Sequence, residues 1–313
     1  MQAVVARGYG APEVMELTRV PRPVAGPGEV LVRVAAAGTN PVDVVSRAGL
    51  IPDWFGRPPY IWGWDISGTV AQVGPGVVRF APGDEVFGMP SFPKIAGGYA
   101  EHVVASAHEL AAKPEKASHV EAAALPLCGL TALQTLDLLD VSAGQRVLVN
   151  GAAGGVGHLA VQLLKALGAH VIGVSREYNH EFLRTLGAAE VVDYQQVRVA
   201  DAVRDVDVVV DCAGDDSLVA SLRRGGVFAR VPGAGNGPGP LDEAASAAGV
   251  RVVRHVVHPD GHGLTRLARA VDDGLLTAAV TATLPLAQAA KAHEMLDGGH
   301  TRGKVVLTVE ARG

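Results

Sequence analysis

The sequence predicts an α/β protein in which a doubly wound parallel sheet is joined to a second region of many short strands. The first observation is residues 146–176, where an apolar strand, a glycine turn, a helix and a second strand follow one another. The second is residues 1–104, where short apolar stretches alternate with turns containing Gly and Pro, as in a small closed β-structure. The third is the length of 313 residues, which favours two domains.

The N-terminal region is expected to be mostly strands. A short helix follows the GTNPVD stretch and ends near Ala48, and a loop covers residues 49–59. Pro114 and the polar residues after it mark a boundary. The predicted strands cover residues 3–6, 13–18, 29–36, 61–73, 85–88 and 98–104.

The central region begins with a predicted helix from Glu121 to about Leu139. Residues 146–150 and 170–174 are apolar strands, and the apolar residues of 158–167 recur at helical spacing until Gly168 ends the helix. The remaining predicted elements are a helix at 181–186 and strands at 191–194, 206–212, 227–231 and 250–257. In the tail, which we expect to pack onto the N-terminal region, they are helices at 264–274 and 286–296 and strands at 278–284 and 304–309.

The glycine turn after Asn150 predicts a dinucleotide site. A pyrophosphate can bind backbone N–H groups at a helix N-terminus only where no side chain blocks its approach. In the G-x-G-x-x-G pattern, Ala152 replaces the first glycine, and Gly154 and Gly157 follow. An ordinary tight turn is the alternative. The residues expected to bind the cofactor here are Gly151, Ala153, Gly154, Gly155, Val156 and Gly157.

The residues after the second strand indicate which cofactor is bound. NAD-binding folds place an Asp or Glu there, whereas NADP-binding folds use a small polar residue and a cation. Ser175 leaves room for a 2′-phosphate, and Arg176 can pair with it. Glu177 as an NAD-type acid is the alternative, as is a purely solvated Arg176. We expect NADPH.

Composition excludes several classes of protein. Hydrophobic residues make up 48% and charged residues 19%, as in a globular chain, and the net charge of −5 does not favour nucleic acid. The first 33 residues lack the apolar core of a signal peptide, and no apolar run is long enough to span a membrane. The two distant cysteines, Cys128 and Cys212, indicate a reducing, cytoplasmic setting.

The chain resembles the medium-chain dehydrogenase/reductase superfamily, and more narrowly its zinc-free quinone oxidoreductase branch, which includes the zeta-crystallins. The similarity extends over nearly the whole chain and depends on the motifs in combination. These are AAAGTNPVD (35–43), GWDISGTVAQVGPGV (63–77), APGDEVFG (81–88), GGYAEHVV (97–104), ALPLCGLTALQTL (124–136), GAAGGVG (151–157), FLRTLGAAEVVDY (182–194) and GHTRGKVVL (299–307).

The resemblance implies a GroES-like β-barrel catalytic domain formed by residues 1–120 and 260–313, and a Rossmann NADP-binding domain formed by residues 121–259. Zinc-dependent members place a Cys where this chain has Asn40 and a His-Glu pair where it has Trp64-Asp65. Neither Asn40 nor Trp64 is a good zinc ligand, so we expect no metal. The eleven histidines are interpreted as scattered surface or capping residues.

Several site residues are implied by the resemblance alone. Thr131 is expected against the nicotinamide, and Asn40 beside its ring; a helix-interior hydroxyl and a turn residue are the alternatives. Tyr194 is expected at the 2′-phosphate. The other implied residues are Ala213, Gly214 and Val256 for the cofactor and Val45, Ile51, Tyr60 and Tyr99 for the substrate cleft.

The implied reaction is transfer of hydride from NADPH to a quinone, or to the C=C of an α,β-unsaturated carbonyl. Related quinone reductases often carry tyrosines at the positions of Val45 and Ile51, which makes a quinone less certain as the natural substrate. Tyr60 and Tyr99 are weak candidates for a proton donor, and packing is the favoured interpretation of both. The alternatives are an enoyl-type reductase of a biosynthetic intermediate and a nucleotide-binding protein without turnover. A homodimer that pairs through residues 250–257 is also implied.

Overall fold

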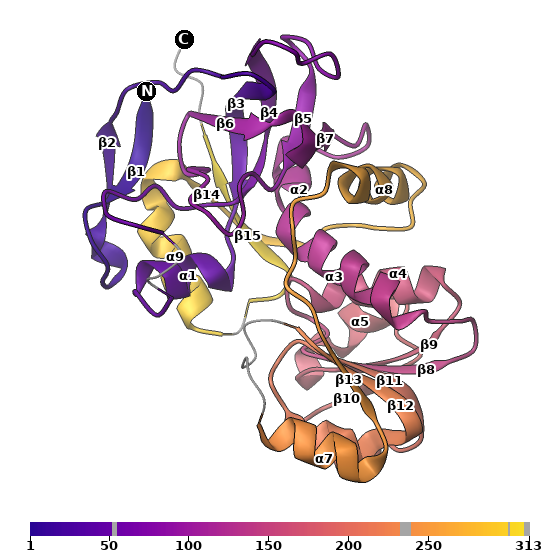
Figure 1. The fold of residues 1–313 in the computed structure, drawn as a ribbon. Helices are drawn as coiled ribbons and strands as arrows, with labels where there is room; N and C mark the ends of the chain where they lie inside the picture. Colours follow the sequence, from indigo (N-terminus) through magenta and orange to yellow (C-terminus); the bar gives the residue numbers. More distant parts are fainter. Residues whose placement is uncertain (52–54, 232–238, 300, 310–313) are drawn as a thin grey trace. The chain divides into compact units, whose positions relative to one another are not determined.

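The computed structural model describes residues 1–51, 55–231, 239–299 and 301–309 (Figure 1). Contacts along the chain divide it into two compact units. Unit 1 comprises Met1–Leu130 and His258–Gly313, and unit 2 comprises Thr131–Val257. The first boundary therefore lies inside helix α3 (Pro126–Leu139).

Unit 2 is built on a six-stranded sheet in which every neighbouring pair is parallel. Its order is β10 (Glu190–Val192), β9 (His170–Val174), β8 (Arg146–Asn150), β11 (Val206–Asp211), β12 (Leu222–Arg230) and β13 (Arg251–Arg254). The chain starts at β8, builds outward to β10, and then returns to the other side of β8 at β11. This reversal is the topological switch of a doubly wound sheet, which confirms the predicted fold class.

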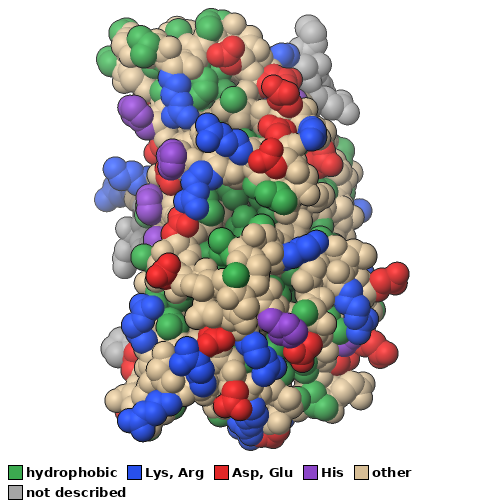
Figure 2. All heavy atoms as spheres, turned by 90° about the vertical axis from the view of Figure 1, so that its right-hand side faces the viewer, with side chains coloured by type: hydrophobic (Ala, Val, Ile, Leu, Met, Phe, Trp, Pro, Cys, Tyr) green, Lys and Arg blue, Asp and Glu red, His purple; other side chains and the backbone are tan. Residues whose placement is uncertain are grey.

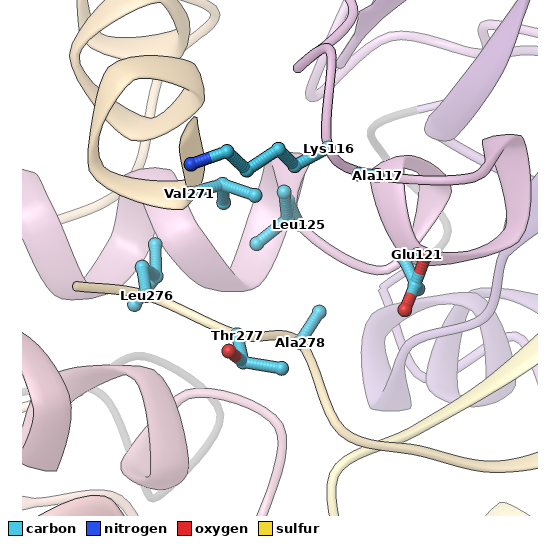
Figure 3. Close-up of a pocket in the computed structure, with 8 residues that line it drawn as sticks. All are labelled: Lys116, Ala117, Glu121, Leu125, Val271, Leu276, Thr277 and Ala278. Atoms are coloured by element: carbon cyan, nitrogen blue, oxygen red, sulfur yellow. The ribbon is translucent and has the colours of Figure 1, made fainter. Parts of the chain in front are cut away.

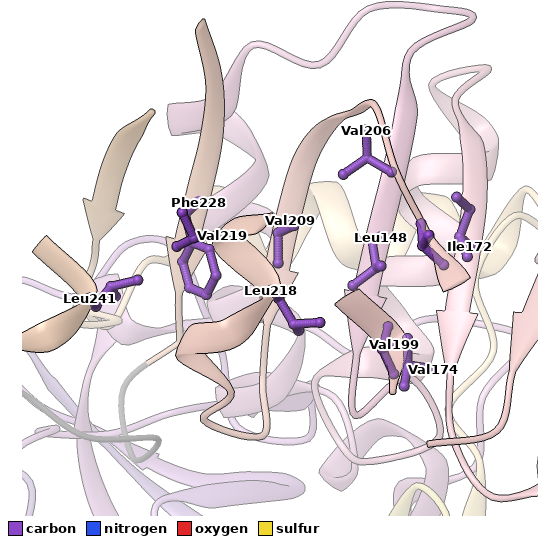
Figure 4. Packing of buried hydrophobic residues seen from close by; sticks show 11 residues of the cluster. Leu148, Ile172, Val174, Val199, Val206, Val209, Leu218, Val219, Phe228 and Leu241 are labelled. Carbon is purple, nitrogen blue, oxygen red and sulfur yellow. The ribbon is translucent and has the colours of Figure 1, made fainter. Parts of the chain in front are cut away.

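Both faces of this sheet are buried. Leu148, Ile172 and Phe228 point into a hydrophobic cluster on one face (Figure 4). Helices α6 (Val199–Ala202) and α7 (Pro240–Ala248) and the 3₁₀ turn η5 (Asp216–Ser221) also contribute side chains to that cluster. Residues of β8 that alternate with Leu148 point the other way, where α4 (Gly157–Ala166) contacts β8 and β9. Burial on two sides explains the continuous valine runs of the strands.

Unit 1 contains a seven-stranded, mostly antiparallel sheet and a two-stranded hairpin of β1 (Gln2–Ala6) and β2 (Met15–Arg19). The large sheet is ordered β14 (Val280–Pro285), β15 (Lys304–Thr308), β3 (Glu29–Gly38), β4 (Asp65–Val73), β5 (Glu85–Gly88) and β7 (Leu110–Ala112), with β6 (His102–Ser106) paired to β3. Because β15 pairs with β3, the tail completes the N-terminal sheet, as predicted. The helices are α1 (Pro41–Arg47), α2 (His119–Ala123), α8 (Gly261–Asp272) and α9 (Ala289–Asp297).

The predicted helix from Glu121 to Leu139 is wrong in one respect, because it is two helices, α2 and α3. Pro126 disfavours the helical conformation of the residue before it and suits the first turn of a new helix. The strand predicted to begin at residue 61 begins at Asp65, after Gly63 adopts a φ of +92°.

Other strand boundaries differ by a few residues. The strand predicted at 98–104 lies at His102–Ser106, that predicted at 191–194 ends at Val192, and that predicted at 250–257 ends at Arg254. The helix predicted at 181–186 is confirmed as α5 (His180–Leu186), one residue longer. Short elements without a strong period were missed, namely β7, α6, α7 and the 3₁₀ turn η4 (Glu177–Asn179). Among the described residues, no helix is both long enough and apolar enough to cross a membrane.

Candidate functional site

The glycine turn connects the end of β8 to the start of α4. Gly151 has a φ of +71°, which disfavours other residues. A Cβ on Gly157 would lie 2.7 Å from the Cα of Ala152, so only glycine allows the first turn of α4 to pack on the preceding backbone. A Cβ on Gly154 would meet only the Gly151 carbonyl oxygen, at 3.3 Å. Gly157 therefore has a packing role, whereas Gly154 is not required by the protein's own packing.

The N-terminus of α4 has no side-chain cap. Within the described chain, the backbone N–H groups of Gly155 and Val156 have no hydrogen-bond acceptor. Ala153 is buried, and the Ala152 N–H donates to the Val174 carbonyl, which ties the turn to β9. Uncapped N–H groups at the start of a ten-residue helix form a binding site for an anion such as a pyrophosphate.

Asp211, at the end of β11, organises the carboxyl edge of the sheet. Its carboxylate accepts from the Asn150 amide at 2.8 Å and from the backbone N–H groups of Ala213 and Gly214 at 3.1 and 2.9 Å. Arg230 of β12 pairs with it at 3.2 Å. Asp211 therefore holds the loop that carries two predicted cofactor residues beside the topological switch. Sequence reasoning missed Asp211, although a charged residue at the end of an apolar strand is a usable signal.

Arg176, Tyr178 and Tyr194 form a group that we call the Arg176 cluster. The Arg176 Nε donates to the Tyr194 hydroxyl at 2.9 Å. This hydrogen bond is the largest cause of a raised pKa of Arg176, and Tyr178 contributes less. Tyr194 was expected to end a strand, but it lies two residues past β10, in the turn beside the end of β9.

The residues around the Arg176 cluster are held by backbone contacts. Ser175 is buried, and its hydroxyl donates to the Arg176 carbonyl at 3.2 Å. Asp193 accepts from the backbone N–H groups of Glu177 at 3.1 Å and Gln195 at 2.8 Å, so it joins the loops after β9 and β10. The side chain of Glu177 is exposed.

Two further predicted residues lie elsewhere in unit 2. Thr131 is 4% exposed, on α3. Val256 was placed in a strand, but it follows the end of β13 and is 56% exposed. Its neighbour His255 contacts the Gln134 side chain at 2.8 Å, so this segment contacts α3.

In unit 1, Asn40 belongs to a buried group that we call the Lys304 cluster, with Asp65, Cys128 and Lys304. The Asn40 amide donates to Asp65 at 2.9 Å, and its oxygen accepts from the Lys304 ammonium. Lys304 also pairs with Asp65 at 3.0 Å and lies 3.6 Å from the Cys128 sulfur. The side chain of Asn40 thus points into a fully buried network. Sequence reasoning missed Lys304, although a lysine as the first residue of an apolar strand is a usable signal.

The Lys304 cluster keeps its cation charged. Burial lowers the pKa of Lys304, but Cys128, Asp65 and Asp43 outweigh burial and raise it overall. Burial raises the pKa of Cys128, which Lys304 only partly opposes, so the thiol stays protonated at neutral pH. Asp65 also accepts from the Leu127 N–H at 2.6 Å. A buried ion pair is tolerated when both of its charged groups also make hydrogen bonds.

A second buried polar group in unit 1 contains Asp43, Tyr99, His293 and Arg47. Asp43 accepts from the backbone N–H of Asn40 at 2.7 Å, and burial raises its pKa to about 7. The Tyr99 hydroxyl lies 3.2 Å from His293 Nε2, and burial, with Arg47 nearby, lowers the pKa of His293 to about 3. The expectation that the histidines are surface or capping residues is wrong for His293 and His158, both fully buried.

The remaining predicted cleft residues also belong to unit 1. Tyr60 is buried, its hydroxyl donates to the Gly56 carbonyl at 2.9 Å, and burial raises its pKa to about 12. Tyr99 is buried too. Packing therefore accounts for the placement of both rings. Val45, in α1, and Ile51 are half-buried.

No three His, Cys, Asp or Glu side chains in the described part of the chain come together as metal ligands. The Trp64 ring is buried, and its N–H donates to the Lys94 carbonyl at 2.7 Å. On the face shown in Figure 2, Lys and Arg side chains are interspersed with Asp and Glu.

A pocket in unit 1 is separate from these groups (Figure 3). Its apolar floor contains Leu125, Val271 and Leu276, and Lys116 and Glu121 lie at its rim. The Lys116 backbone N–H donates to Asp272 at 3.0 Å, and the Glu121 carboxylate caps α2 through Ser118. Both charged residues are engaged in local structure, and none of the predicted site residues lines this pocket.

Comparison with known proteins found two matching families. The family described as alcohol dehydrogenase GroES-like domain matches residues 26–115, and that described as zinc-binding dehydrogenase matches residues 186–307. A 2-haloacrylate reductase from Burkholderia sp is 34% identical, over 99% of this chain and 100% of that protein. The chloroplastic NADPH-dependent alkenal/one oxidoreductase of Arabidopsis thaliana is 33% identical, over 98% of this chain and 79% of that protein.

Among solved structures, the quinone oxidoreductase from Coxiella burnetii superposes with a TM-score of 0.92 at 34% sequence identity. The match covers 99% of this chain and 99% of that chain. The likeness therefore includes both units, and each relative's name describes a reductase or oxidoreductase.

Proposed function

This chain belongs to the quinone oxidoreductase branch of the medium-chain dehydrogenase/reductase superfamily, and from that premise we propose that it is an NADPH-dependent reductase. Its substrate would be a quinone or the C=C of an α,β-unsaturated carbonyl. The observation that carries the proposal is the carboxyl edge of the unit 2 sheet. There the uncapped start of α4 and the Arg176 cluster follow two adjacent parallel strands, β8 and β9.

These residues fit the chemistry of NADPH. The N–H groups of Gly155 and Val156 would bind the pyrophosphate, because they lack acceptors within the described chain. Arg176 and Tyr194 would bind the 2′-phosphate. Asp211 would keep Ala213 and Gly214 in place near the switch point, where small residues allow the cofactor to approach. Bound NADPH supplies the hydride, and the protein supplies binding and orientation.

The proposed reaction does not depend on zinc. Asn40 and Trp64 occupy the positions where zinc-dependent members carry ligands, and neither is suited to zinc. The Asn40 amide is instead engaged by Asp65 and Lys304. Asn40 and Thr131 are proposed as positioning residues, and no side chain is assigned as the proton donor.

Two further proposals concern assembly and location. Among the described residues, the strand β13 forms one edge of the unit 2 sheet, where a strand of a second copy could pair. We propose a homodimer formed at this edge, which sedimentation at micromolar concentration would test. Within the described chain, Cys128 and Cys212 form no disulfide, which supports a reducing, cytoplasmic setting.

The test of the proposed function is NADPH oxidation by the purified protein in the presence of a chelator. The acceptors are 1,2-naphthoquinone, simple enones and an enoyl thioester. Turnover of a quinone or enone that survives chelation supports the proposal. Turnover of the thioester alone favours the enoyl-type reductase, and NADPH binding without turnover on any acceptor favours a non-catalytic binder.

A further inference from the structure

The side chain of Asn40 is held from both ends by a buried ion pair. Its amide nitrogen donates to Asp65 at 2.9 Å, and its oxygen accepts from the Lys304 ammonium. The ammonium and the Asp65 carboxylate are 3.0 Å apart. All three side chains are buried, so solvent does not take the place of any of these partners.

The chemistry of the ion pair fixes which end of the amide faces which partner. An ammonium only donates hydrogen bonds, and a carboxylate only accepts them. Turning the Asn40 amide over would bring its N–H groups against Lys304 and its oxygen against Asp65, and both hydrogen bonds would be lost. The pair therefore holds the amide nitrogen in one orientation.

One N–H of Asn40 is left over when the hydrogen bonds of the Lys304 cluster are counted. Lys304 has three N–H groups, and its three neighbours are Asn40, Asp65 and Cys128. The Cys128 thiol also lies 3.5 Å from the Asn40 oxygen, and the other Asp65 oxygen accepts from the Leu127 N–H. An amide nitrogen carries two hydrogens, and within the described chain only the one directed at Asp65 has an acceptor. An oxygen of a bound molecule would satisfy the second.

The backbone next to Asn40 does not depend on this pair. The Thr39 N–H and hydroxyl both donate to the Val305 carbonyl, at 3.0 and 2.8 Å, which joins this segment to β15. The Asn40 backbone N–H donates to Asp43 at 2.7 Å, at the start of α1. Other contacts therefore set the position of the Asn40 backbone, and the Lys304 side chain acts on the amide group.

We propose that the second N–H of the Asn40 amide donates to the carbonyl oxygen of the acceptor, and that Lys304, with Asp65, positions it. This inference rests on the proposed function, which supplies an acceptor with such an oxygen. Hydride transfer to the β-carbon of an enone moves electrons through the conjugated system onto its carbonyl oxygen, and a proton from solvent then completes the product at the α-carbon. A quinone oxygen gains negative charge in the same way. An N–H donor that is held in place before the reaction stabilises that charge.

The first experiment uses a variant that turns the amide over while leaving Asn40 in place. In the neutral pair variant, Asp65→Asn with Lys304→Met, the Leu127 N–H still requires an oxygen from the new amide at position 65. The NH₂ group of that new amide then faces Asn40, whose own amide must turn to present its oxygen. Both charges are removed together, so no unpaired carboxylate remains.

The full-length protein is assayed by NADPH oxidation with 1,2-naphthoquinone or a simple enone, at a temperature at which circular dichroism finds every variant folded. Asn40→Leu should lower kcat about 100-fold, as for the loss of one oxyanion donor, and the neutral pair variant should lower it at least about tenfold. Adding Asn40→Leu to the neutral pair should leave kcat no lower than Asn40→Leu alone, because the pair acts through the amide. The control is Val305→Ala, a buried β15 position whose truncation lowers stability; its kcat should stay within about twofold of wild type.

The second experiment detects the contact without turnover. The sequence has four asparagines, so ¹⁵N-asparagine labelling gives few side-chain amide signals, and the Asn40 signal is the one that Asn40→Leu removes. This signal should not shift when NADP⁺ is added, and it should shift when the same acceptor is added to the NADP⁺ complex.

Several results would overturn the assignment. Unchanged kcat in the neutral pair variant would exclude the role of Lys304, and an equal loss in Val305→Ala would show a general effect of stability. A lower kcat in the combined variant than in Asn40→Leu would show that the pair acts by another route. An Asn40 signal that shifts with NADP⁺ alone, or with neither addition, would exclude the contact with the acceptor. If the signal shifts as expected but the wild type reduces no acceptor, the proposed function fails and the contact stands.

Discussion

Replacing Lys304 with methionine removes the cation of the Lys304 cluster while nearly keeping the length of the side chain. Lys304 is 2% exposed and Asp65 is fully buried, so water cannot replace the lost partner. The change leaves a buried carboxylate unpaired and deprives the Asn40 amide oxygen of its ammonium donor. Breaking a buried pair in this way typically costs about 3–5 kcal/mol of unfolding free energy.

The structure places this variant at the lower end of that range. Asp65 still accepts from the Leu127 N–H at 2.6 Å and from the Asn40 amide at 2.9 Å, so its charge stays partly solvated. We therefore expect a loss of about 3 kcal/mol. With an m-value of about 2 kcal/mol/M, the urea midpoint should fall by about 1.5 M.

The assay is urea unfolding followed by tryptophan fluorescence, which reports on unit 1 because all three tryptophans belong to its sequence. The matched variant is the double substitution Asp65→Asn with Lys304→Met, which removes both charges. It should recover most of the loss, because the remaining amide can still hydrogen-bond its neighbours. A single Lys304→Met variant that unfolds within about 0.3 M urea of wild type would refute the reasoning.

The other predictions concern the cofactor site and the buried titratable groups. Arg176→Ala should weaken NADPH about 10- to 100-fold and NADH little, because a charge-assisted hydrogen bond contributes about 1.5–3 kcal/mol; fluorescence titration that finds equal losses would exclude the 2′-phosphate role. Gly157→Ala should lower the melting temperature and weaken NADPH, since its Cβ would lie 2.7 Å from Ala152 Cα, and unchanged melting would show that α4 can shift freely. In the folded protein, burial raises the pKa of Asp43 to about 7, whereas the unfolded carboxyl loses its proton near pH 4. Between these two values the folded state binds the extra proton, so the contribution of Asp43 to stability falls as pH rises toward 7. His293 has the opposite effect, because its pKa in the folded protein is lowered to about 3. Below pH 6.5 the unfolded state binds a proton that the folded state does not, so stability falls as pH falls. Asp43→Asn should therefore lose stability on acidification more steeply than wild type, and parallel curves from pH 4 to 7 would contradict the assignment for Asp43.

The sequence by itself determined the elements that local patterns control. The unit from β8 to β9 was predicted with both strand boundaries correct, because strand alternation, helical spacing and the glycine turn are all local signals. Gly157 could be singled out for the same reason, since its packing partner Ala152 is five residues away. Boundaries were less accurate where pairing decides them, as at Val256, which a continuous valine pattern placed in a strand that ends at Arg254.

Only the tertiary structure decided the buried polar groups. Lys304 and Asn40 are separated by 264 positions in the sequence, and they meet because β15 pairs with β3. Asp211 gained its role from the adjacency of β8, β11 and β12, and Tyr194 gained its place beside Arg176 from that of β9 and β10. A charged or polar residue carries no periodic signal of its own. Its partners are set by strand order and loop geometry, which arise from burial of the whole sheet and not from the neighbouring residues.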